Sequence, residues 1–253
     1  MRYAAALRGL VLSAGLIAVW QVTVWLTGAP HYILPGPARV FGALAAHAPL
    51  LTEHALTTAA EILLGLALGT LLGATSAMVM DYARSVRLWL MPVLVVSQAV
   101  PVFALAPLLV LWLGYGMASK VAMATLIIFF PVTAAFLDGL RRTEPGWMDL
   151  AQSMGASRWN ALRHIRMPAA LPAFASGLRV ATAVAPIGAV VGEWVGSASG
   201  LGHLMLQANA RMQTDLMFAA LFVLAVLAIA LYFVIDQLLI RALPWVAETS
   251  NRS

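Results

Sequence analysis

The chain has 253 residues, of which 62% are hydrophobic and 10% are charged, and its formal net charge at pH 7 is +5. A soluble domain of this length has too little interior to cover so much apolar surface, so the composition excludes an ordinary soluble enzyme and indicates an all-α membrane protein. The chain contains no Cys, which excludes disulfides and thiolate metal sites.

Six apolar runs predict membrane-spanning helices, because about 20 helical residues cross a hydrocarbon core of about 30 Å. We expect one polytopic domain over residues 1–253, with spans at about 7–27, 56–80, 88–113, 118–138, 171–195 and 216–240. The first run continues through Trp20 and Trp25 with no small-residue cleavage pattern after it. We therefore expect a retained span rather than a cleaved signal peptide.

The second predicted span carries a glycine at every fourth position, namely Gly65, Gly69 and Gly73. Such a ridge lets another helix backbone approach closely, so we expect these glycines to serve helix packing. Prolines interrupt the third, fourth and fifth predicted spans at Pro92, Pro101, Pro107, Pro131 and Pro186. Broken helices at membrane depth line a path or are buried in protein, whereas static kinks are the alternative for any single proline.

Positive charges favour one orientation of the six predicted spans. With the N-terminus inside, the outer segments hold only Arg39, Lys120 and Arg211. The inner segments then hold Arg2, Arg8, Arg84, Arg87, Arg141, Arg142, Arg158, Arg163, Arg166, Arg241 and Arg252. An excess of Arg on one side marks the cytoplasmic side, so both termini are predicted to be cytoplasmic.

The largest inner loop, residues 139–170, has the pattern of a helix, a turn and a second helix. Gly155 is placed to end the first helix in a left-handed conformation, and Ser157 is placed to cap the second. Pro168 and Pro172 are expected to stop the second helix before the fifth span. An amphipathic elbow of this kind lies on the lipid surface, binds a soluble partner or packs on its own bundle, and the pattern alone does not choose among these.

Part of this loop resembles the EAA loop of binding-protein-dependent ABC importer permeases, which runs E-A-A, three residues, G, nine residues, I-x-L-P. The matching residues are Asp149-Leu150-Ala151, Gly155 and Ile165-x-Met167-Pro168, with Asp149, Leu150 and Met167 departing from the usual residue types. The resemblance implies that the loop docks in a cleft of a cytoplasmic ATPase. The coupling residues it implies are Asp149, Ala151, Gly155, Ala156, Trp159, Ile165 and Pro168. By the same resemblance Asp149, Ala151 and Gly155 shape the dock, while Trp159 and Ile165 hold the loop against the bundle.

The same resemblance implies the assembly. Two copies of this permease would form a homodimer in the lipid bilayer of the bacterial inner membrane, with a cytoplasmic ABC ATPase dimer that binds ATP and Mg. A periplasmic or lipid-anchored solute-binding protein would deliver the solute. The chain itself is then no enzyme and holds no cofactor, metal or nucleic acid, in agreement with the lack of a Walker A loop and of metal-ligand spacing among its His residues.

Other segments resemble the nitrate/sulfonate/taurine type of these permeases. Gly192-Glu193-Trp194 and residues 206–215 are similar to a branch associated with pyrimidine precursors of thiamine. The resemblance implies a small polar solute, either a hydroxymethylpyrimidine-like thiamine precursor or a sulfonate, taurine or nitrate. An ion-coupled secondary transporter is the alternative from another class, but it would need internal repeats and a midplane ion site.

Polar groups inside predicted spans are candidates for a translocation path, because ionisable side chains in a bilayer cost several kcal/mol. The ionisable and polar candidates are Glu61, Gln98, Arg179 and Glu193, and the helix-breaking Pro101 and the neighbouring Trp194 are added to them. A structural ion pair or interfacial anchoring explains each of these residues nearly as well.

Overall fold

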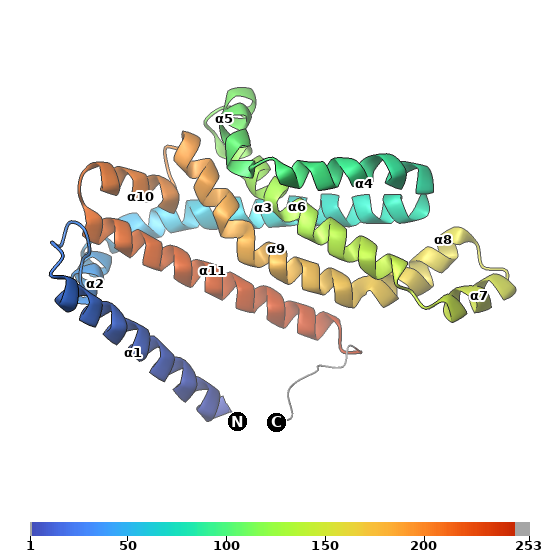
Figure 1. The fold of residues 1–253 in the computed structure, drawn as a ribbon, viewed down its shortest axis with the longest axis horizontal. Coiled ribbons are helices and arrows are strands. Elements are labelled where there is room, and N and C mark those ends of the chain that lie inside the picture. The colour runs from blue at the N-terminus through green and yellow to red at the C-terminus, as the bar shows by residue number, and fades with distance from the viewer. Residues whose placement is uncertain (1, 246–253) are drawn as a thin grey trace.

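The computed structural model describes residues 2–245, except for the side chains of residues 2–10 and 13. Every regular element in this part is helical (Figure 1). The helices are α1 (Arg2–Thr27), α2 (Pro37–Ala46), α3 (Ala48–Tyr82), α4 (Arg84–Ala99), α5 (Val102–Leu113), α6 (Met117–Arg141), α7 (Pro145–Ser153), α8 (Arg158–Ala161), the π-helix η1 (Leu162–Arg166), α9 (Met167–Gly196), α10 (Leu201–Ala210) and α11 (Thr214–Ala242). Arg252 and the side chains of Arg2 and Arg8, which entered the predicted orientation, lie outside the described part.

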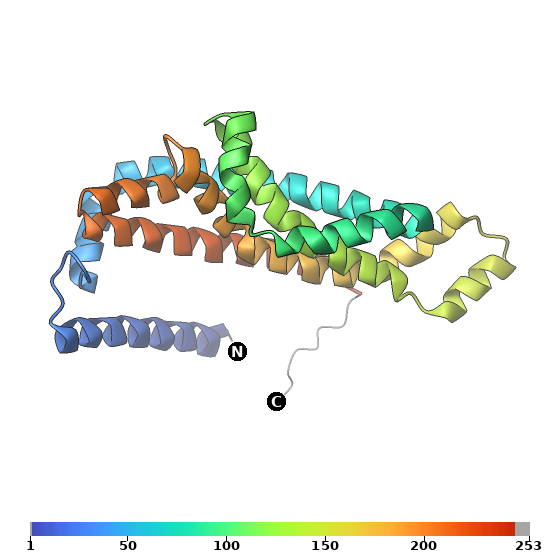
Figure 2. The ribbon, with the colours of Figure 1, turned by 45° about the horizontal axis from the view of Figure 1, so that its top comes forward.

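The centre of the molecule is formed by α3, α6 and α9, which run alongside one another in both ribbon views (Figures 1 and 2). The predicted glycine ridge on α3 faces α6. A Cβ atom on Gly69 would lie 2.6 Å from Cγ2 of Ile128, and one on Gly73 would lie 3.0 Å from Cγ1 of Val132. Glycine at these positions therefore lets the two backbones approach more closely than any side chain would allow.

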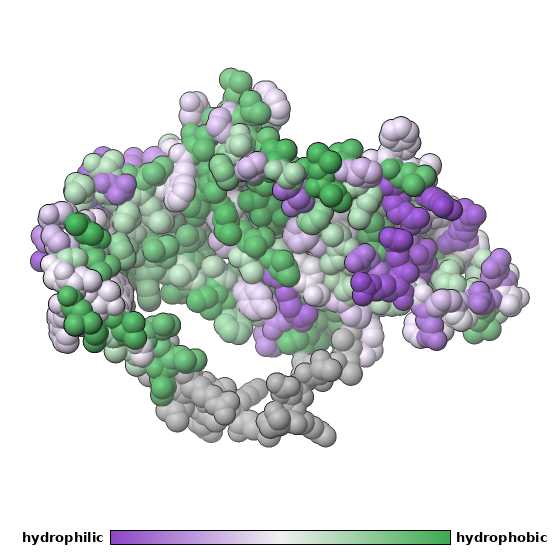
Figure 3. All heavy atoms as spheres, viewed as in Figure 1, coloured by the Kyte–Doolittle hydropathy of each residue, from purple (hydrophilic) through white to green (hydrophobic). Residues whose placement is uncertain are grey.

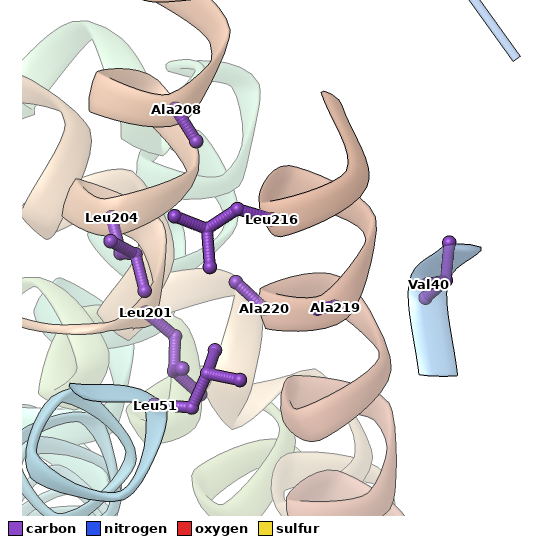
Figure 4. Packing of buried hydrophobic residues seen from close by; sticks show 8 residues of the cluster. All are labelled: Val40, Leu51, Leu201, Leu204, Ala208, Leu216, Ala219 and Ala220. Atoms are coloured by element: carbon purple, nitrogen blue, oxygen red, sulfur yellow. The ribbon is translucent and has the colours of Figure 1, made fainter. Parts of the chain in front are cut away.

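Apart from the central packing of α3, α6 and α9, an apolar cluster joins α2, α3, α10 and α11 at the end of the molecule far from α7 and α8 (Figures 1 and 4). Its buried members are Val40, Leu51, Leu201, Leu204, Ala208, Leu216, Ala219 and Ala220. Because α10 contributes three of these side chains, the short helix is packed onto the bundle rather than left as a surface loop.

Four helices are long and apolar enough to cross a membrane, namely Ala48–Tyr82, Met117–Arg141, Arg158–Gly196 and Thr214–Ala242. A fifth crossing is present if α4 and α5 are taken as one bent span. In α1 the described apolar stretch, Ala14–Thr27, is shorter than a span. The described residues therefore contain four or five candidate spans instead of the six that were predicted.

The predicted third span, 88–113, is not one helix. It is divided into α4 and α5, whose axes are bent by 102°, and α5 projects away from the bundle (Figures 1 and 2). The break falls at Pro101, and the preceding Val100 is extended, with φ −82° and ψ 120°, because a proline ring disfavours the helical conformation of the residue before it. Pro92 and Pro107 lie inside α4 and α5 without breaking them.

The predicted boundary before the fifth span is also wrong. Pro168 and Pro172 do not stop the second helix of the loop, because α8, η1 and α9 form one continuous helix over Arg158–Gly196. In η1 the N–H of Met167 donates to the carbonyl of Leu162, five residues back. This wider π turn sits directly before Pro168 and lets the helix continue through a residue that has no N–H of its own.

Candidate functional site

The end of the molecule that carries α7 and α8 is built as an elbow, defined here as residues 145–166 (Figure 1). Gly155 has φ +74°, and its N–H donates to Gln152 O at 3.0 Å while the N–H of Ala156 donates to Ala151 O at 2.9 Å. These two bonds form the Schellman arrangement that closes α7. Ser157 then caps α8, since its Oγ accepts from the N–H of Asn160 at 3.2 Å.

The coupling residues implied by the sequence lie on different sides of this elbow. Ala151 is buried, Ala156 and Ile165 are half-buried, and Asp149, Gly155 and Pro168 are exposed. Trp159 is 54% exposed, but its ring meets that of Tyr82 on α3 edge-on, with the centroids 6.3 Å apart. Trp159, one of the residues expected to hold the loop against the bundle, therefore contacts the end of the long helix α3.

An arginine that sequence reasoning did not single out anchors the elbow more firmly. Arg166 Nη1 lies 2.6 Å from Oδ2 of Asp81, whose side chain is almost fully buried at the end of α3. The Nε and Nη2 of Arg166 donate to the carbonyl oxygen of Leu140, at the end of α6, at 3.1 and 3.0 Å. One guanidinium thus connects the elbow to two helices of the bundle, and Leu162 buries its side chain beside it. No local signal in the sequence pairs residues so far apart.

One exposed face of α7, continued by its C-cap residue Met154, is apolar. Trp147, Leu150 and Met154 are 52%, 61% and 78% exposed. Together with Ile165 and Pro168 they line a groove of about 490 Å³. The groove lies at the end of the molecule where hydrophilic side chains gather (Figure 3). A set of large apolar side chains amid a polar surface is typical of a protein interaction site.

The candidate path residues do not gather at one place. Gln98 and Pro101 are exposed at the break between α4 and α5. Arg179, on α9, donates from Nε to Oδ1 of Asp236 on α11 at 2.6 Å. Trp194 is 49% exposed at the end of α9, whereas its neighbour Glu193 is buried.

Glu193 is the centre of a hydrogen-bonded cluster between α3, α9 and the start of α10. Its Oε1 accepts from Thr58 Oγ1 at 2.6 Å, and its Oε2 accepts from the N–H groups of Gly202 at 2.5 Å and His203 at 3.3 Å. Thr58 Oγ1 in turn accepts from the N–H of Leu201 at 2.8 Å. The carboxylate therefore caps α10 and ties this helix to α3, which the sequence did not indicate.

Other titratable groups surround this cluster. Glu61 and Lys120 are buried, and Lys120 Nζ donates to the carbonyl oxygens of Tyr115 and Gly116 at 2.5 and 2.9 Å. Burial, followed by the nearby imidazole of His54, lowers the pKa of His203 on α10. Among residues 2–245 no group of three or more His, Asp or Glu side chains is arranged to hold a metal ion.

Comparison with known proteins identifies relatives over nearly the whole chain. The chain is 57% identical over 235 residues to a protein of Haemophilus influenzae described as a probable ABC transporter permease, a match covering 93% of this chain and 96% of that protein. It is 37% identical to the formylaminopyrimidine transport permease protein ThiX of Halalkalibacterium halodurans, over 91% of this chain and 92% of that one. It is 38% identical to the riboflavin transport system permease protein RibX of Chloroflexus aurantiacus, over 89% of this chain and 86% of that one.

The fold is similar to that of a chain from an inward-facing structure of the MetNI methionine ABC transporter. The TM-score is 0.67 at 19% sequence identity, and the match covers 78% of this chain and 98% of that chain. The family model described as the binding-protein-dependent transport system inner membrane component matches residues 65–243. This chain therefore belongs to that family, and it is a multi-pass permease subunit of a binding-protein-dependent ABC importer of the inner membrane.

Proposed function

We propose that the elbow of this permease is the contact through which a cytosolic ATPase drives transport. The observation that carries the proposal is the exposed apolar face of α7, with Trp147, Leu150 and Met154 at the hydrophilic end of the molecule. Burial of such side chains contributes about 25 cal/mol per Å², so leaving them in water is unfavourable unless a partner covers them. A binding-protein-dependent ABC importer works with an ATPase and a solute-binding protein, and the ATPase is the cytosolic one.

We call the ATPase-binding surface of the elbow the dock. Each coupling residue implied by the sequence has a structural role in it. Gly155 and Ala156 set the angle between α7 and α8 through the Schellman turn, and Ala151 packs beneath the turn. Asp149 is exposed on α7 and is available to an opposite charge on the ATPase. Trp159, Ile165 and Pro168 transmit displacement to the bundle, since they lie where the elbow enters the continuous helix that includes α9.

The membrane arrangement that fits this role has six crossings and both termini in the cytoplasm. It takes α1 as the first crossing and the bent pair α4 and α5 as the third. The support is the excess of Arg in alternate segments, which would place the elbow on the cytoplasmic side. Two copies of the chain, each bound to one ATPase subunit, would enclose the translocation path.

Transport then follows from linkage between nucleotide binding and permease conformation. Closure of the ATPase dimer moves the two elbows together and favours the outward-facing state, into which the binding protein releases solute. ATP hydrolysis restores the inward-facing state. A ligand shifts such an equilibrium only by its differential affinity for the two states, so the contacts of the elbow must differ between them.

For the solute we propose a small polar nitrogen heterocycle, such as a hydroxymethylpyrimidine-like precursor of thiamine. The support is the similarity to ThiX, whose name refers to formylaminopyrimidine, and to RibX, whose name refers to another nitrogen heterocycle, riboflavin. A sulfonate, taurine or nitrate is the second candidate. Uptake of labelled pyrimidine, taurine and nitrate by cells that carry or lack this chain decides between the two.

The dock is tested by placing a charge on its apolar face. Leu150→Glu is expected to weaken association with the ATPase about tenfold or more, since truncating or charging a central interface residue costs more than about 1 kcal/mol. The measurement is the amount of ATPase that co-purifies with the permease at several ATPase concentrations. Ser153→Glu is the matched control, because Ser153 is exposed on the same helix but does not line the groove. An equal loss of co-purified ATPase in both variants, or no loss of it in Leu150→Glu, would count against the dock.

A further inference from the structure

We propose that a cavity between the start of α4 and the elbow binds the phosphate headgroup of an anionic phospholipid. The cavity has a volume of about 500 Å³, and its lining includes Arg84 and Arg87 of α4, Arg158 and Arg166 of the elbow, and Asp81 at the end of α3. This inference rests on the proposed function in one respect, because it takes the elbow to lie on the cytoplasmic side.

The charge of the cavity is unbalanced. Arg166 is committed to Asp81 and to the carbonyl of Leu140. Among the residues that the structure describes, no carboxylate lies within 4.0 Å of the side-chain nitrogens of Arg84, Arg87 or Arg158. Three guanidinium groups around one cavity suit a phosphate group, since the planar fork of Arg donates two parallel hydrogen bonds to phosphate oxygens.

The backbone favours the same ligand. α4 has 16 residues and begins at Arg84, its N-cap residue Ala83 supplies no side-chain hydrogen bond, and its first turn contains no acidic side chain. The first N–H groups of a helix lack partners within the helix, and the helix dipole favours an anion there. The cavity therefore combines unpaired positive charge with an uncapped helix N-terminus.

A neighbouring feature identifies the anion as part of a lipid rather than a free ion. On the same helix, Val86, Trp89, Leu90 and Val93 line an apolar groove of about 560 Å³, and Trp89 is 83% exposed. An acyl chain would fit this groove along α4, and the long side chains of Arg84 and Arg87 at the start of the same helix would reach around to its headgroup. Basic pockets at the cytoplasmic ends of membrane helices bind anionic headgroups in this manner.

The cavity also has a consequence for coupling. Ala151, Gln152 and Ala156 line it from the side of the elbow. A headgroup held there touches both α4 and the turn that sets the angle between α7 and α8. Bound lipid would thus hold the elbow in one orientation relative to the membrane, and coupling efficiency would depend on the content of anionic lipid.

The test measures lipid retention by the full chain purified from membranes, without the ATPase. The chain is incubated in detergent with equal amounts of phosphatidylglycerol and phosphatidylethanolamine, and native mass spectrometry reports which lipid it keeps. We expect preferential retention of phosphatidylglycerol by the wild-type chain, and retention about thirtyfold weaker in Arg84→Gln/Arg87→Gln. Arg142→Gln/Arg163→Gln is the matched control, since it removes the same charge at the same end of the molecule from residues that do not line the cavity. We expect this control to retain the lipid as the wild type does.

Three outcomes would overturn the proposal. The first is equal phosphatidylglycerol retention by the cavity variant and the control, at matched thermal unfolding midpoints. The second is displacement of the lipid by an equal concentration of inorganic phosphate, which would make the cavity a site for the free anion. The third, which needs a separate co-purification with the ATPase, is wild-type lipid retention by Arg84→Gln/Arg87→Gln together with loss of its ATPase, which would make the cavity a protein contact. Because lipid retention is measured on the chain alone, failure of the ATPase dock and failure of this lipid site give different results.

Discussion

Gly155→Val is expected to lower solute uptake about tenfold while membrane insertion and folding stay largely intact. Gly155 has φ +74° at the turn between α7 and α8, a conformation that costs an L residue about 1–2 kcal/mol and a β-branched residue most of all. A Cβ on Gly155 would meet nothing within 4 Å, so the substitution produces backbone strain without a clash. The strained turn relaxes by changing the angle of α7, and an energy change of about 1.4 kcal/mol shifts a coupled equilibrium tenfold.

The measurement is ATP-driven uptake into proteoliposomes that contain the permease, the ATPase and the binding protein, alongside the rate of ATP hydrolysis. Gly155→Asn is the matched control, because Asn tolerates the left-handed conformation and is found at the ends of helices. We expect Asn to preserve most uptake, and Val to allow hydrolysis without uptake. Wild-type uptake by the Val variant would show that the turn geometry is irrelevant to coupling.

Glu193→Ala is expected to destabilise the folded permease by about 3–5 kcal/mol. The substitution leaves the N–H groups of Gly202 and His203 without their acceptor, whereas Thr58 Oγ1 loses Glu193 but can still donate to the carbonyl oxygen of His54. Each unsatisfied buried group costs about 1–3 kcal/mol. The cap of α10 would be lost as well, and α10 would be held to α3 only by the bond from the N–H of Leu201 to Thr58 Oγ1, the bond from the N–H of Gly200 to His54 and the apolar cluster. Folded protein recovered from the membrane should fall sharply.

Thermal unfolding in detergent and the monodisperse fraction on gel filtration measure this effect. Glu193→Gln is expected to lie between the wild type and Ala, since its amide carbonyl still accepts from one donor. Trp194→Ala serves as a neighbouring control, because Trp194 is 49% exposed on the same helix turn and makes none of these bonds. If Glu193→Ala unfolded at the wild-type temperature but failed to transport, Glu193 would be a path residue and not a structural one.

Features set by local chemistry could be predicted from the sequence. A Gly followed two residues later by a Ser predicts the end of one helix and the cap of the next, and Gly155 and Ser157 take those positions. The apolar runs likewise predict the long helices, since their length and composition are read directly from the chain. The EAA-like spacing pointed to the family, which the match over residues 65–243 shows.

Features set by distant neighbours could not be predicted. Five prolines interrupted predicted spans, but only the one at Pro101 ends a helix, because packing decides where the freed backbone groups find new partners. The same limit applies to Pro168, which a π turn accommodates. Thr58 and Glu193 are 135 positions apart in the sequence, and Arg179 and Asp236 are 57 positions apart, yet each pair is hydrogen-bonded. From the sequence alone, Glu193 and Arg179 are therefore candidates both for a solute path and for a structural pair, and the structure supplies the partners that the sequence does not show.

The most direct test of the ATPase dock uses the absence of native Cys in the chain. Met154→Cys places a single thiol on the apolar face of α7, at a position 78% exposed. In membrane vesicles with the whole importer present, we expect a thiol-directed cross-linker to join this position to the ATPase. In vesicles stripped of the ATPase, we expect an impermeant thiol reagent to react with it only from the cytoplasmic side. Reaction only from the outer side, with no cross-link to the ATPase, would contradict a cytosolic ATPase dock on the elbow.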